Sequence, residues 1–403
     1  MNEIIVIKFG GSVLSNEKMI ERAANAVKNC VEKGLRTVIV ISALKGVTDS
    51  LINLAKKVNP NTPKDLMDEI LSMGERTSAR LFANALIAKG LNPVIVDPSF
   101  DNWPIITDEN FLDANPDYQK TSILVMEKLM PILEAGKIPI VCGFLGKSES
   151  GKVTTLGRGG SDTTAILLGS CLNAKEVVLV KDVDTVFSSD PDLVENPIPI
   201  TQLDAEEAYA LTLGGAKFLH PKALAYKRAN VRLRIASLAN GSLGGTVIDG
   251  GAIELKIERM NEPISMVTII GSEASELESI RLFIDEVKRS GGVLVSMSIE
   301  PKSIILYIAG GENIPNRLHN IMINKGLGKA LSAYGDLAMI TIRGPAIETV
   351  PGMIQRVTQP LAREGINIFG IATISSSIKL FIKRDEADKV ISMLKSALMV
   401  SEA

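Results

Sequence analysis

The sequence predicts an α/β protein: a three-layer αβα domain built on a mainly parallel sheet, followed by two ferredoxin-like βαββαβ modules. Over the first 260 residues, short runs of Ile, Val and Leu alternate with amphipathic helical stretches, which is typical of strand–helix–strand crossover units. The chain is 46% hydrophobic but only 4% aromatic, and such β-branched runs suit a parallel sheet covered by helices on both faces. After residue 260 the order of elements changes, which indicates a second architecture.

The elements of the first domain follow from short local patterns. Residues 4–9 (IIVIKF) predict a strand that ends at a glycine pair, and apolar residues at helical spacing predict a helix over residues 17–33. Equivalent strands are expected at 37–43, 93–97, 138–144, 177–183 and 231–237. Because parallel strands present their carboxyl ends at one edge of the sheet, we expect a ligand site along that edge.

The second part of the chain repeats one pattern about 70 residues apart. From Ile264 a strand, a helix and two strands follow one another, and a second round begins near Asp336. Two helices on one face of a small antiparallel sheet form the ferredoxin-like arrangement. We therefore expect domains at residues 1–260, 261–335 and 336–403.

Composition excludes several classes of protein. The net charge is −2 and no basic stripe is visible, which argues against a nucleic-acid binder. The longest apolar runs are too short to span a bilayer, and the N-terminus lacks the pattern of a signal peptide. Three scattered cysteines and two histidines favour neither a disulfide framework nor a structural zinc site. We expect a cytoplasmic protein with reduced thiols and with no membrane partner.

The first candidate site is KFGGS at residues 8–12, where the first strand ends. Glycines let the backbone approach a phosphate, and amides of the following turn can donate to it. Lys8 would then place a positive charge on the phosphate oxygens. The alternative is an ordinary strand-to-helix turn with a surface lysine, and the segment matches neither GxxxxGK[ST] nor GxGxxG.

Hydroxyl and acidic side chains follow near the next strand end. Ser42 and Thr48 lie in ISALKGVTDSL, and for Thr48 taken singly the favoured interpretation is a cap of a helix that begins near Asp49. Glu75 follows a glycine within the helical segment SMGERTSAR. It could bind an ammonium group, or it could be an ordinary solvated charge on a helix.

The segment TTLGRGGSDTTA at residues 154–165 gives the strongest single signal. Gly159, Gly160 and Ser161 supply closely spaced backbone donors, and Arg158 is suited to grip a carboxylate with two parallel hydrogen bonds. Asp162 begins an apolar helix and could be only its N-cap. Both interpretations can hold together, because a cap would fix the loop that presents Arg158.

Two later segments have weaker signals. Asp182, in KDVDTVFSSDPD, follows a buried strand and could meet a ribose or a metal-bound phosphate, or it could form a turn. In GGAKFLHPKAL, Lys217 follows a glycine pair. His220 has no second histidine or cysteine nearby, so a packing or hydrogen-bonding role is favoured over metal binding.

In their order along the chain, KFGGSV, SALKGVTD, GERTSAR, TTLGRGGSD, KDVDTVFSSDP and GAKFLHPKAL resemble the aspartokinase branch of the amino acid kinase family. The tail resembles the tandem ACT modules of that branch. The resemblance implies attack of the β-carboxylate of L-aspartate on the γ-phosphate of ATP, which gives 4-phospho-L-aspartate and ADP. This is the first step towards the amino acids that derive from aspartate, and a homodimer through the ACT modules is also implied.

The same resemblance implies a role for each matching residue. The residues implied to act in catalysis are Lys8, Asp162 and Lys217. Those implied to surround aspartate are Ser42, Thr48, Glu75, Arg158, Gly159, Gly160 and Ser161. Those implied to contact ATP are Lys8, Gly10, Gly11, Ser12, Lys181, Asp182, Phe187, Lys217 and Phe218. A carboxylate is already ionised at neutral pH, so positioning and charge neutralisation would suffice, with Mg²⁺ held mainly by the nucleotide phosphates and not by a protein metal site.

One segment departs from the family pattern, which usually reads TDVDGVYTADPR. This chain has Thr185, Phe187 and Asp192 where the family has glycine, tyrosine and arginine. An anion in place of a cation predicts weaker ATP binding, and we hypothesise that Lys181, in place of the usual threonine, restores the charge.

Two alternatives to this function stay open. One is another small-molecule kinase of the same fold, acting on acetylglutamate or a nucleoside monophosphate. The other is a catalytically silent amino-acid sensor. Glu75 and Arg158 together favour an acceptor with a free amino and a free carboxylate group, whereas the departures near Thr185 slightly favour the sensor.

Overall fold

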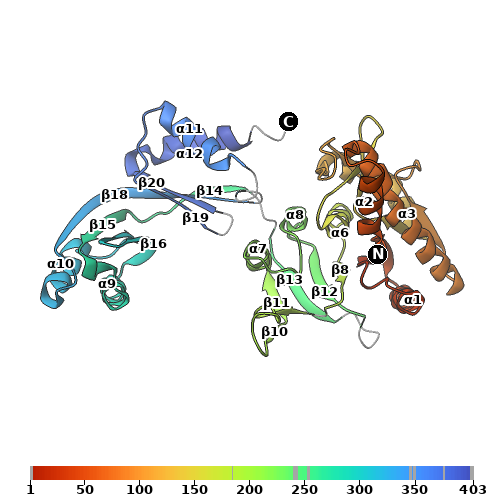
Figure 1. Ribbon diagram of the computed structural model, residues 1–403, viewed down its shortest axis with the longest axis horizontal. Helices are drawn as coiled ribbons and strands as arrows, with labels where there is room; N and C mark the ends of the chain where they lie inside the picture. The colour runs from red at the N-terminus through yellow and green to blue at the C-terminus, as the bar shows by residue number, and fades with distance from the viewer. Residues whose placement is uncertain are drawn as a thin grey trace. The chain divides into compact units, whose positions relative to one another are not determined.

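The computed structural model describes residues 3–183, 185–238, 244–251, 255–344, 347, 351–374 and 377–399. The chain divides into two compact units, Met1–Ile253 and Glu254–Ala403 (Figure 1). Within the described ranges, every helix is too short or too polar to cross a membrane.

The main sheet of the first unit has, in the described part of the chain, eight strands in the order β11-β13-β12-β8-β1-β2-β5-β3. Neighbouring strands run parallel from β12 to β3, whereas β13 is antiparallel to β12. In chain order they are β1 (Ile4–Phe9), β2 (Arg36–Ile41), β3 (Pro93–Val96), β5 (Ile138–Cys142), β8 (Glu176–Val180), β11 (Gln202–Asp204), β12 (Arg232–Ala236) and β13 (Gly245–Asp249). Every residue of β1 is buried, as expected for a central strand with helices on both faces.

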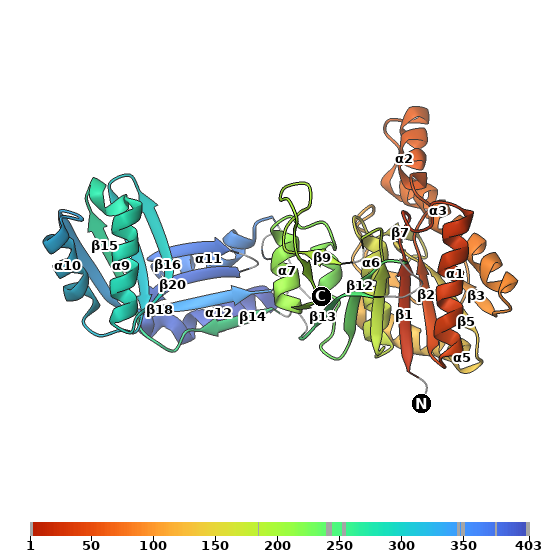
Figure 2. The ribbon, with the colours of Figure 1, turned by 90° about the horizontal axis from the view of Figure 1, so that it is seen from below.

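Helices form the two outer layers of this unit (Figure 2). Helices α1 and α3 pack on β2 and on each other, whereas α6 packs on β1 and β8 beside α4 and α8. The helices are α1 (Glu17–Glu32), α2 (Val47–Val58), α3 (Lys64–Ala88), α4 (Tyr118–Lys128), α5 (Met130–Glu134), α6 (Gly160–Cys171), α7 (Ala205–Leu213) and α8 (Pro221–Leu224). Two smaller sheets complete the unit, one of β4 (Ile106–Thr107), β6 (Leu145–Ser148) and β7 (Val153–Thr155) and one of β9 (Val186–Phe187) and β10 (Pro199–Ile200).

The predicted strands of the first unit are all present, and the predicted helix over 17–33 is α1. Two strands, β3 and β12, end one residue earlier than predicted, and three end two or three residues earlier: β2 at Ile41, β5 at Cys142 and β8 at Val180. The residues that follow these three ends, 42–43, 143–144 and 181–183, leave the sheet as loops. Periodicity therefore locates the strands well, but it extends them into the loops at their carboxyl ends.

The second unit contains one sheet, whose order in the described residues is β16-β17-β15-β18-β20-β19, with β14 also paired to β18. Its strands are β14 (Lys256–Arg259), β15 (Ile264–Ile270), β16 (Val293–Glu300), β17 (Ser303–Ala309), β18 (Ala330–Arg343), β19 (Gly370–Ile374) and β20 (Ser377–Lys383). Its helices are α9 (Leu277–Arg289), α10 (Ile314–Lys325), α11 (Met353–Arg363) and α12 (Ala387–Met399). The first half of β18 pairs with β15, and its second half pairs with β20 and β14.

Each half of this sheet has the ferredoxin-like strand order, as the sequence predicts. In the first module the order is β18-β15-β17-β16, and in the second it is β14-β18-β20-β19. The second module therefore takes its fourth strand from the segment that precedes the first module. The sequence pattern predicts a contiguous second module, because β14 is short and largely exposed and gives no clear strand signal.

The close packing of α6 on β8 depends on Gly169. A Cβ atom at this position would lie 2.1 Å from Cγ2 of Val177. We expect Gly169→Ala to lower the free energy of unfolding of the first unit by about 1–3 kcal/mol, because the helix must move away from the sheet. Trp103 is the only tryptophan of the chain and is buried in this unit, so its fluorescence during urea unfolding measures the effect.

Gly214→Ala is the control for this change. A Cβ atom there meets only carbonyl oxygens at 3.4 Å, which is ordinary contact. If the two variants unfold at the same urea concentration, the helix–sheet contact is not the constraint described.

Candidate active site

A cavity of about 380 Å³ lies at the carboxyl ends of β1 and β2, next to the start of α6. This volume suits a small-molecule ligand. The residues implied to surround aspartate all line it, together with Lys8, Gly11 and Asp162. The structure thus brings together residues that lie up to 154 positions apart in the sequence, from Lys8 to Asp162. It lies at the edge of the sheet that the strand directions predict.

Two lysines share the buried carboxylate of Asp162, which lines this cavity together with Lys8. The Nζ atom of Lys8 lies 2.9 Å from Oδ1 of Asp162, and Nζ of Lys181 lies 2.8 Å from Oδ2 of the same residue. Lys8 is in β1 and Lys181 directly follows β8, the neighbouring parallel strand. The two strands therefore deliver one ammonium group to each oxygen of Asp162, and the group of three has a net charge of one positive unit.

The charges of this group are fixed by their mutual contacts. Burial alone would raise the pKa of Asp162, but the positive charges of Lys181 and Lys8 outweigh it and hold that pKa well below its usual range. Burial lowers the pKa of Lys8 by more than the carboxylate of Asp162 raises it. Asp162 is therefore an anion at neutral pH, and its role in this structure is to hold two cations in place.

The KFGGS turn combines a close backbone approach with free amides. A Cβ at Gly11 would lie 2.5 Å from the carbonyl oxygen of Ala43, and one at Gly10 would lie 3.3 Å from Nζ of Lys8. The Gly10 amide already donates to the Val180 carbonyl oxygen. Among the described residues, the amides of Gly11 and Ser12 donate to no protein group, so only these two can serve a ligand.

The loop after β2 is held against α3 by side chains of that helix. The Ala43 amide donates to Oε1 of Glu75 at 3.0 Å, and the Leu44 amide donates to Oγ of Ser78 at 3.0 Å. A Cβ at Gly74 would lie 2.9 Å from Cβ of Ala43, so the helix and the loop meet where glycine permits it. Thr48 does not cap α2, which begins at Val47 after Gly46.

Glu75 has one oxygen without a partner. Its Oε2 atom is buried and makes no hydrogen bond in the described part of the chain. Burial raises the pKa of Glu75 to about 7, although the hydrogen bond from the Ala43 amide opposes this. The interpretation of Glu75 as a solvated helix charge is therefore wrong, because its side chain is buried and lines the cavity.

The turn before α6 presents Arg158 to the cavity. Gly157 and Gly159 on either side both have positive φ angles, of 71° and 74°. Asp162 does not cap the helix, because Gly159 occupies the N-cap position and Asp162 lies within the first turn. Within the described ranges, the guanidinium group of Arg158 makes no hydrogen bond or ion pair with the protein, and the residue is exposed. It is thus available to a ligand.

Seven residues implied to contact ATP do not line the cavity: Gly10 and Ser12 of the KFGGS turn, and Lys181, Asp182, Phe187, Lys217 and Phe218. Asp182 is exposed, and Phe187 is half-buried in β9. Lys217 has an 81% exposed side chain and lies 3.4 Å from Asp190, whereas Phe218 is buried in the main core. Lys181 is connected to the cavity only through its ion pair with Asp162. Asp184 of the same motif lies outside the described residues.

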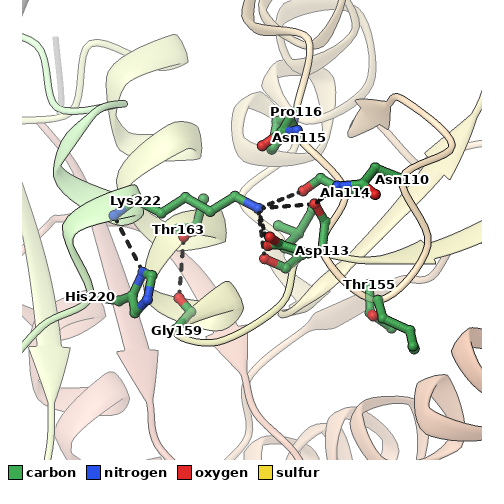
Figure 3. A network of polar contacts seen from close by, with 12 residues as sticks. Asn110, Asp113, Ala114, Asn115, Pro116, Thr155, Gly159, Thr163, His220 and Lys222 are labelled. Carbon is green, nitrogen blue, oxygen red and sulfur yellow. Dashed lines mark hydrogen bonds and ion pairs between the residues drawn. The ribbon is translucent and has the colours of Figure 1, made fainter. Parts of the chain in front are cut away.

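Sequence reasoning missed two supports of the site. Asp68 is fully buried and accepts hydrogen bonds from the Thr155 amide and hydroxyl and from the Leu112 amide. Lys222 contacts the segment around Asp113 (Figure 3). The Asp68–Thr155 and Lys222–Asp113 contacts join residues 87 and 109 positions apart, so no local pattern could have shown them. His220 has the expected hydrogen-bonding role, because its Nδ1 accepts from the Lys222 amide.

Comparison with known proteins agrees with the geometry. Residues 3–237 match the amino acid kinase family and residues 332–396 match an ACT domain. An aspartokinase of Geobacillus stearothermophilus is 31% identical over 394 residues, which cover 95% of this chain and 93% of that protein. An aspartokinase of Bacillus sp. (strain MGA3) is 30% identical over 99% of this chain and 98% of its own length. The chain belongs to the aspartokinases of the amino acid kinase family.

Solved aspartokinase structures share this fold. The crystal structure of aspartate kinase from Synechocystis superposes with a TM-score of 0.81 at 25% identity, covering 98% of this chain and 69% of that one. Aspartokinase III of E. coli, crystallised with aspartate and ADP, has a TM-score of 0.56 at 22% identity. As an aspartokinase the chain is an enzyme, a kinase, and the silent-sensor alternative is not favoured.

The buried Glu75 carboxyl predicts a pH-dependent stability. Because its pKa rises from 4.5 to about 7 on folding, its neutral form stabilises the fold below pH 4.5, and that contribution is lost as the pH rises through 7. We expect the difference in unfolding free energy between Glu75→Gln and the unmodified protein to shift by about 3 kcal/mol towards the variant between pH 4.5 and 8. Urea unfolding followed by Trp103 fluorescence measures it.

Glu21→Gln is the matched control for this titration. Glu21 is exposed and the hydrogen bond from Lys89 lowers its pKa, so the difference from the unmodified protein should stay flat between pH 5 and 8. A flat difference for Glu75→Gln as well would contradict the burial argument.

Proposed function

We propose that this chain phosphorylates the β-carboxylate of L-aspartate with ATP, giving 4-phospho-L-aspartate and ADP. One observation carries the proposal. A single cavity presents the Oε2 atom of Glu75 and the guanidinium of Arg158, neither of which has a partner among the described residues, together with the Lys8–Asp162 pair. A free amino acid has at least one ammonium and one carboxylate group, and these match the anionic Glu75 and the cationic Arg158 on the walls of one small site.

The substrate side of the site follows from these charges. The ammonium group of aspartate would contact Glu75, and a carboxylate would contact Arg158 in the two-bond geometry that guanidinium groups favour. Ser42, Thr48, Gly159, Gly160 and Ser161 complete this wall of the cavity, although the Gly160 amide already donates to the Gly157 carbonyl oxygen. An ammonium beside Glu75 also favours the ionised carboxylate, which burial otherwise disfavours.

The nucleotide side lies at the KFGGS turn. The free amides of Gly11 and Ser12 and the ammonium of Lys8 would meet the phosphates, with Asp182, Phe187, Lys217 and Phe218 assigned to the rest of ATP by resemblance alone. In the described part of the chain, no three His, Cys, Asp or Glu side chains gather as a metal site. By resemblance we assign Mg²⁺ to the nucleotide phosphates, whose charge it would neutralise.

The chain's own residues contribute placement and charge to the reaction. The attacking carboxylate is already ionised at neutral pH, so no residue needs to remove a proton. Lys8 neutralises charge on the transferred phosphoryl group, and Asp162 holds Lys8 at the correct place. Lys217 has a catalytic role only by resemblance, since its ammonium lies beside Asp190 and outside the cavity.

The proposal extends to organisation and location. It includes a kinase domain over 1–260, ACT modules over 261–335 and 336–403, a homodimer through those modules and a cytoplasmic location. The pairing of β14 with β18 and the end of the first unit at residue 253 support a first boundary nearer 253 than 260.

The acceptor is tested by a coupled ADP assay with L-aspartate, acetylglutamate and UMP in parallel. We expect ADP release with aspartate alone, together with a hydroxamate signal from the acyl phosphate. Activity with either other acceptor and none with aspartate would overturn the proposal in favour of another kinase of this fold. No activity with any of the three would favour the sensor.

The nucleotide side predicts a role for Lys181. Removing its charge leaves Lys8 and Asp162 as a neutral pair, so the phosphates meet one positive charge fewer. We expect Lys181→Thr to raise the KM for ATP about fivefold, the size of a partly screened charge contact.

Lys175→Thr is the control, because Lys175 lies at the opposite end of the same strand and pairs with Glu3 on the surface. Its KM for ATP should equal that of the unmodified enzyme. An unchanged KM in Lys181→Thr would refute the hypothesis that Lys181 restores the charge lost at Asp192.

A further inference from the structure

We propose that Lys222 is a positioning residue that fixes the turn on which Arg158 is presented. This inference rests on the proposed function, since it concerns how that site holds its acceptor. Lys222 is the second residue of the short helix α8 and does not line the cavity. Its side chain extends from α8 towards Asp113 and Ala114 (Figure 3).

The Lys222 ammonium joins two segments that are otherwise distant in sequence. Its Nζ atom lies 2.6 Å from Oδ1 of Asp113, 2.9 Å from the carbonyl oxygen of Ala114 and 3.1 Å from that of Leu156. The Asp113 carbonyl oxygen lies further off, at 3.4 Å. An ammonium group has three protons, so the three short contacts use all of its donors. Ala114 and Leu156 are fully buried, so their carbonyls depend on protein donors.

One of these segments leads directly into the turn that carries Arg158, and the other contacts that turn. Leu156 immediately precedes Gly157, where a Cβ would lie 2.4 Å from Oδ1 of Asp113, the atom that Lys222 binds. The backbone at Gly157 therefore rests against the carboxylate held by Lys222. The Ala114 amide donates to the carbonyl oxygen of Thr155, which ties the same two segments a second time.

The other side of the turn contacts His220, two residues before Lys222. A Cβ at Gly159 would lie 2.4 Å from Cβ of His220, whose ring accepts from the Lys222 amide. Asp113 and His220 thus bracket the turn at Gly157 and Gly159, and Lys222 connects the two. Arg158 lies between these two contacts, and its side chain has no protein partner in the described ranges. The position of the backbone at Gly157 and Gly159 therefore determines from where the Arg158 side chain extends.

This arrangement assigns Lys222 to binding of the acceptor more than to the chemical step. Displacing the turn moves Arg158 away from the acceptor carboxylate, whereas Lys8 and Asp162 are held by β1, α6 and their own ion pair. A misplacement of about 1 Å can reduce enzyme activity by up to about a hundredfold. An effect on acceptor binding with little change in turnover separates positioning from a general loss of stability.

The test compares Lys222→Met, Lys222→Arg and the control Lys120→Met. Lys120 likewise joins two segments, through ion pairs with Asp117 and Glu149, but it does not line the cavity. We expect Lys222→Met to raise the KM for aspartate about tenfold, with kcat and the KM for ATP within about threefold of the unmodified enzyme. Lys222→Arg keeps the charge and the donors and should recover most of the loss, and Lys120→Met should show none.

Amide hydrogen exchange of the free protein gives a readout that needs no substrate. Lys222→Met should exchange faster at residues 113–114 and 156–160, whereas Lys120→Met should not. If the unmodified enzyme is inactive on aspartate, the kinase proposal fails, but hydrogen exchange still tests whether Lys222 fixes the turn that carries Arg158. Unchanged exchange and an unchanged KM for aspartate in Lys222→Met would overturn the inference. If that variant does not fold, Asp113→Ala removes the carboxylate at Gly157 and must show the same pattern.

Discussion

The structure depends on one buried carboxylate that needs two cations. Asp162 can stay ionised in the interior only because Lys8 and Lys181 neutralise it, and loss of one partner from a buried pair typically costs about 3–5 kcal/mol. The partners come from the ends of β1 and β8, so these strands must be parallel neighbours that end at the same level. Helix α6 must then begin at this edge. Sheet order, strand ends and the start of α6 are therefore set together by one charge group.

Close approach of backbones is the second constraint, and it shapes the cavity itself. Several segments meet at glycine residues, where a Cβ atom would overlap a neighbouring segment. The positions where a Cβ would lie under 3 Å from another segment of the site are Gly11, Gly74, Gly143, Gly157, Gly159 and Gly160. Backbone amides and carbonyls thus become the walls, and only a few charged side chains project inward. A site of this kind discriminates by the placement of charge because its backbone is fixed.

The sequence predicts most of this architecture because its signals are local. Apolar runs locate the strands, and glycine-rich segments with adjacent charges locate Lys8, Glu75 and Arg158, which the fold brings into one cavity. The contributions of Lys222 and Asp68 could not be predicted, since their bonds join segments far apart in the chain. Lys222 lies in the segment GAKFLHPKAL, but nothing in that segment indicates which residues its ammonium contacts. The same reason hides β14, whose partner strand lies some eighty residues further on.

Three buried carboxyl groups show how the surroundings divide their roles. Asp162 has two ammonium partners, and its pKa falls despite burial. Asp68 has three neutral hydrogen-bond donors, and burial still raises its pKa. Glu75 accepts one hydrogen bond from the Ala43 amide through Oε1, and its pKa rises to about 7. Cations therefore decide the charge state more than hydrogen bonds do. Asp162 already has two cationic partners, and Asp68 holds β7 through its hydrogen bonds. Glu75 has no cationic partner among the described residues, so the ammonium group of a ligand would favour its ionised form.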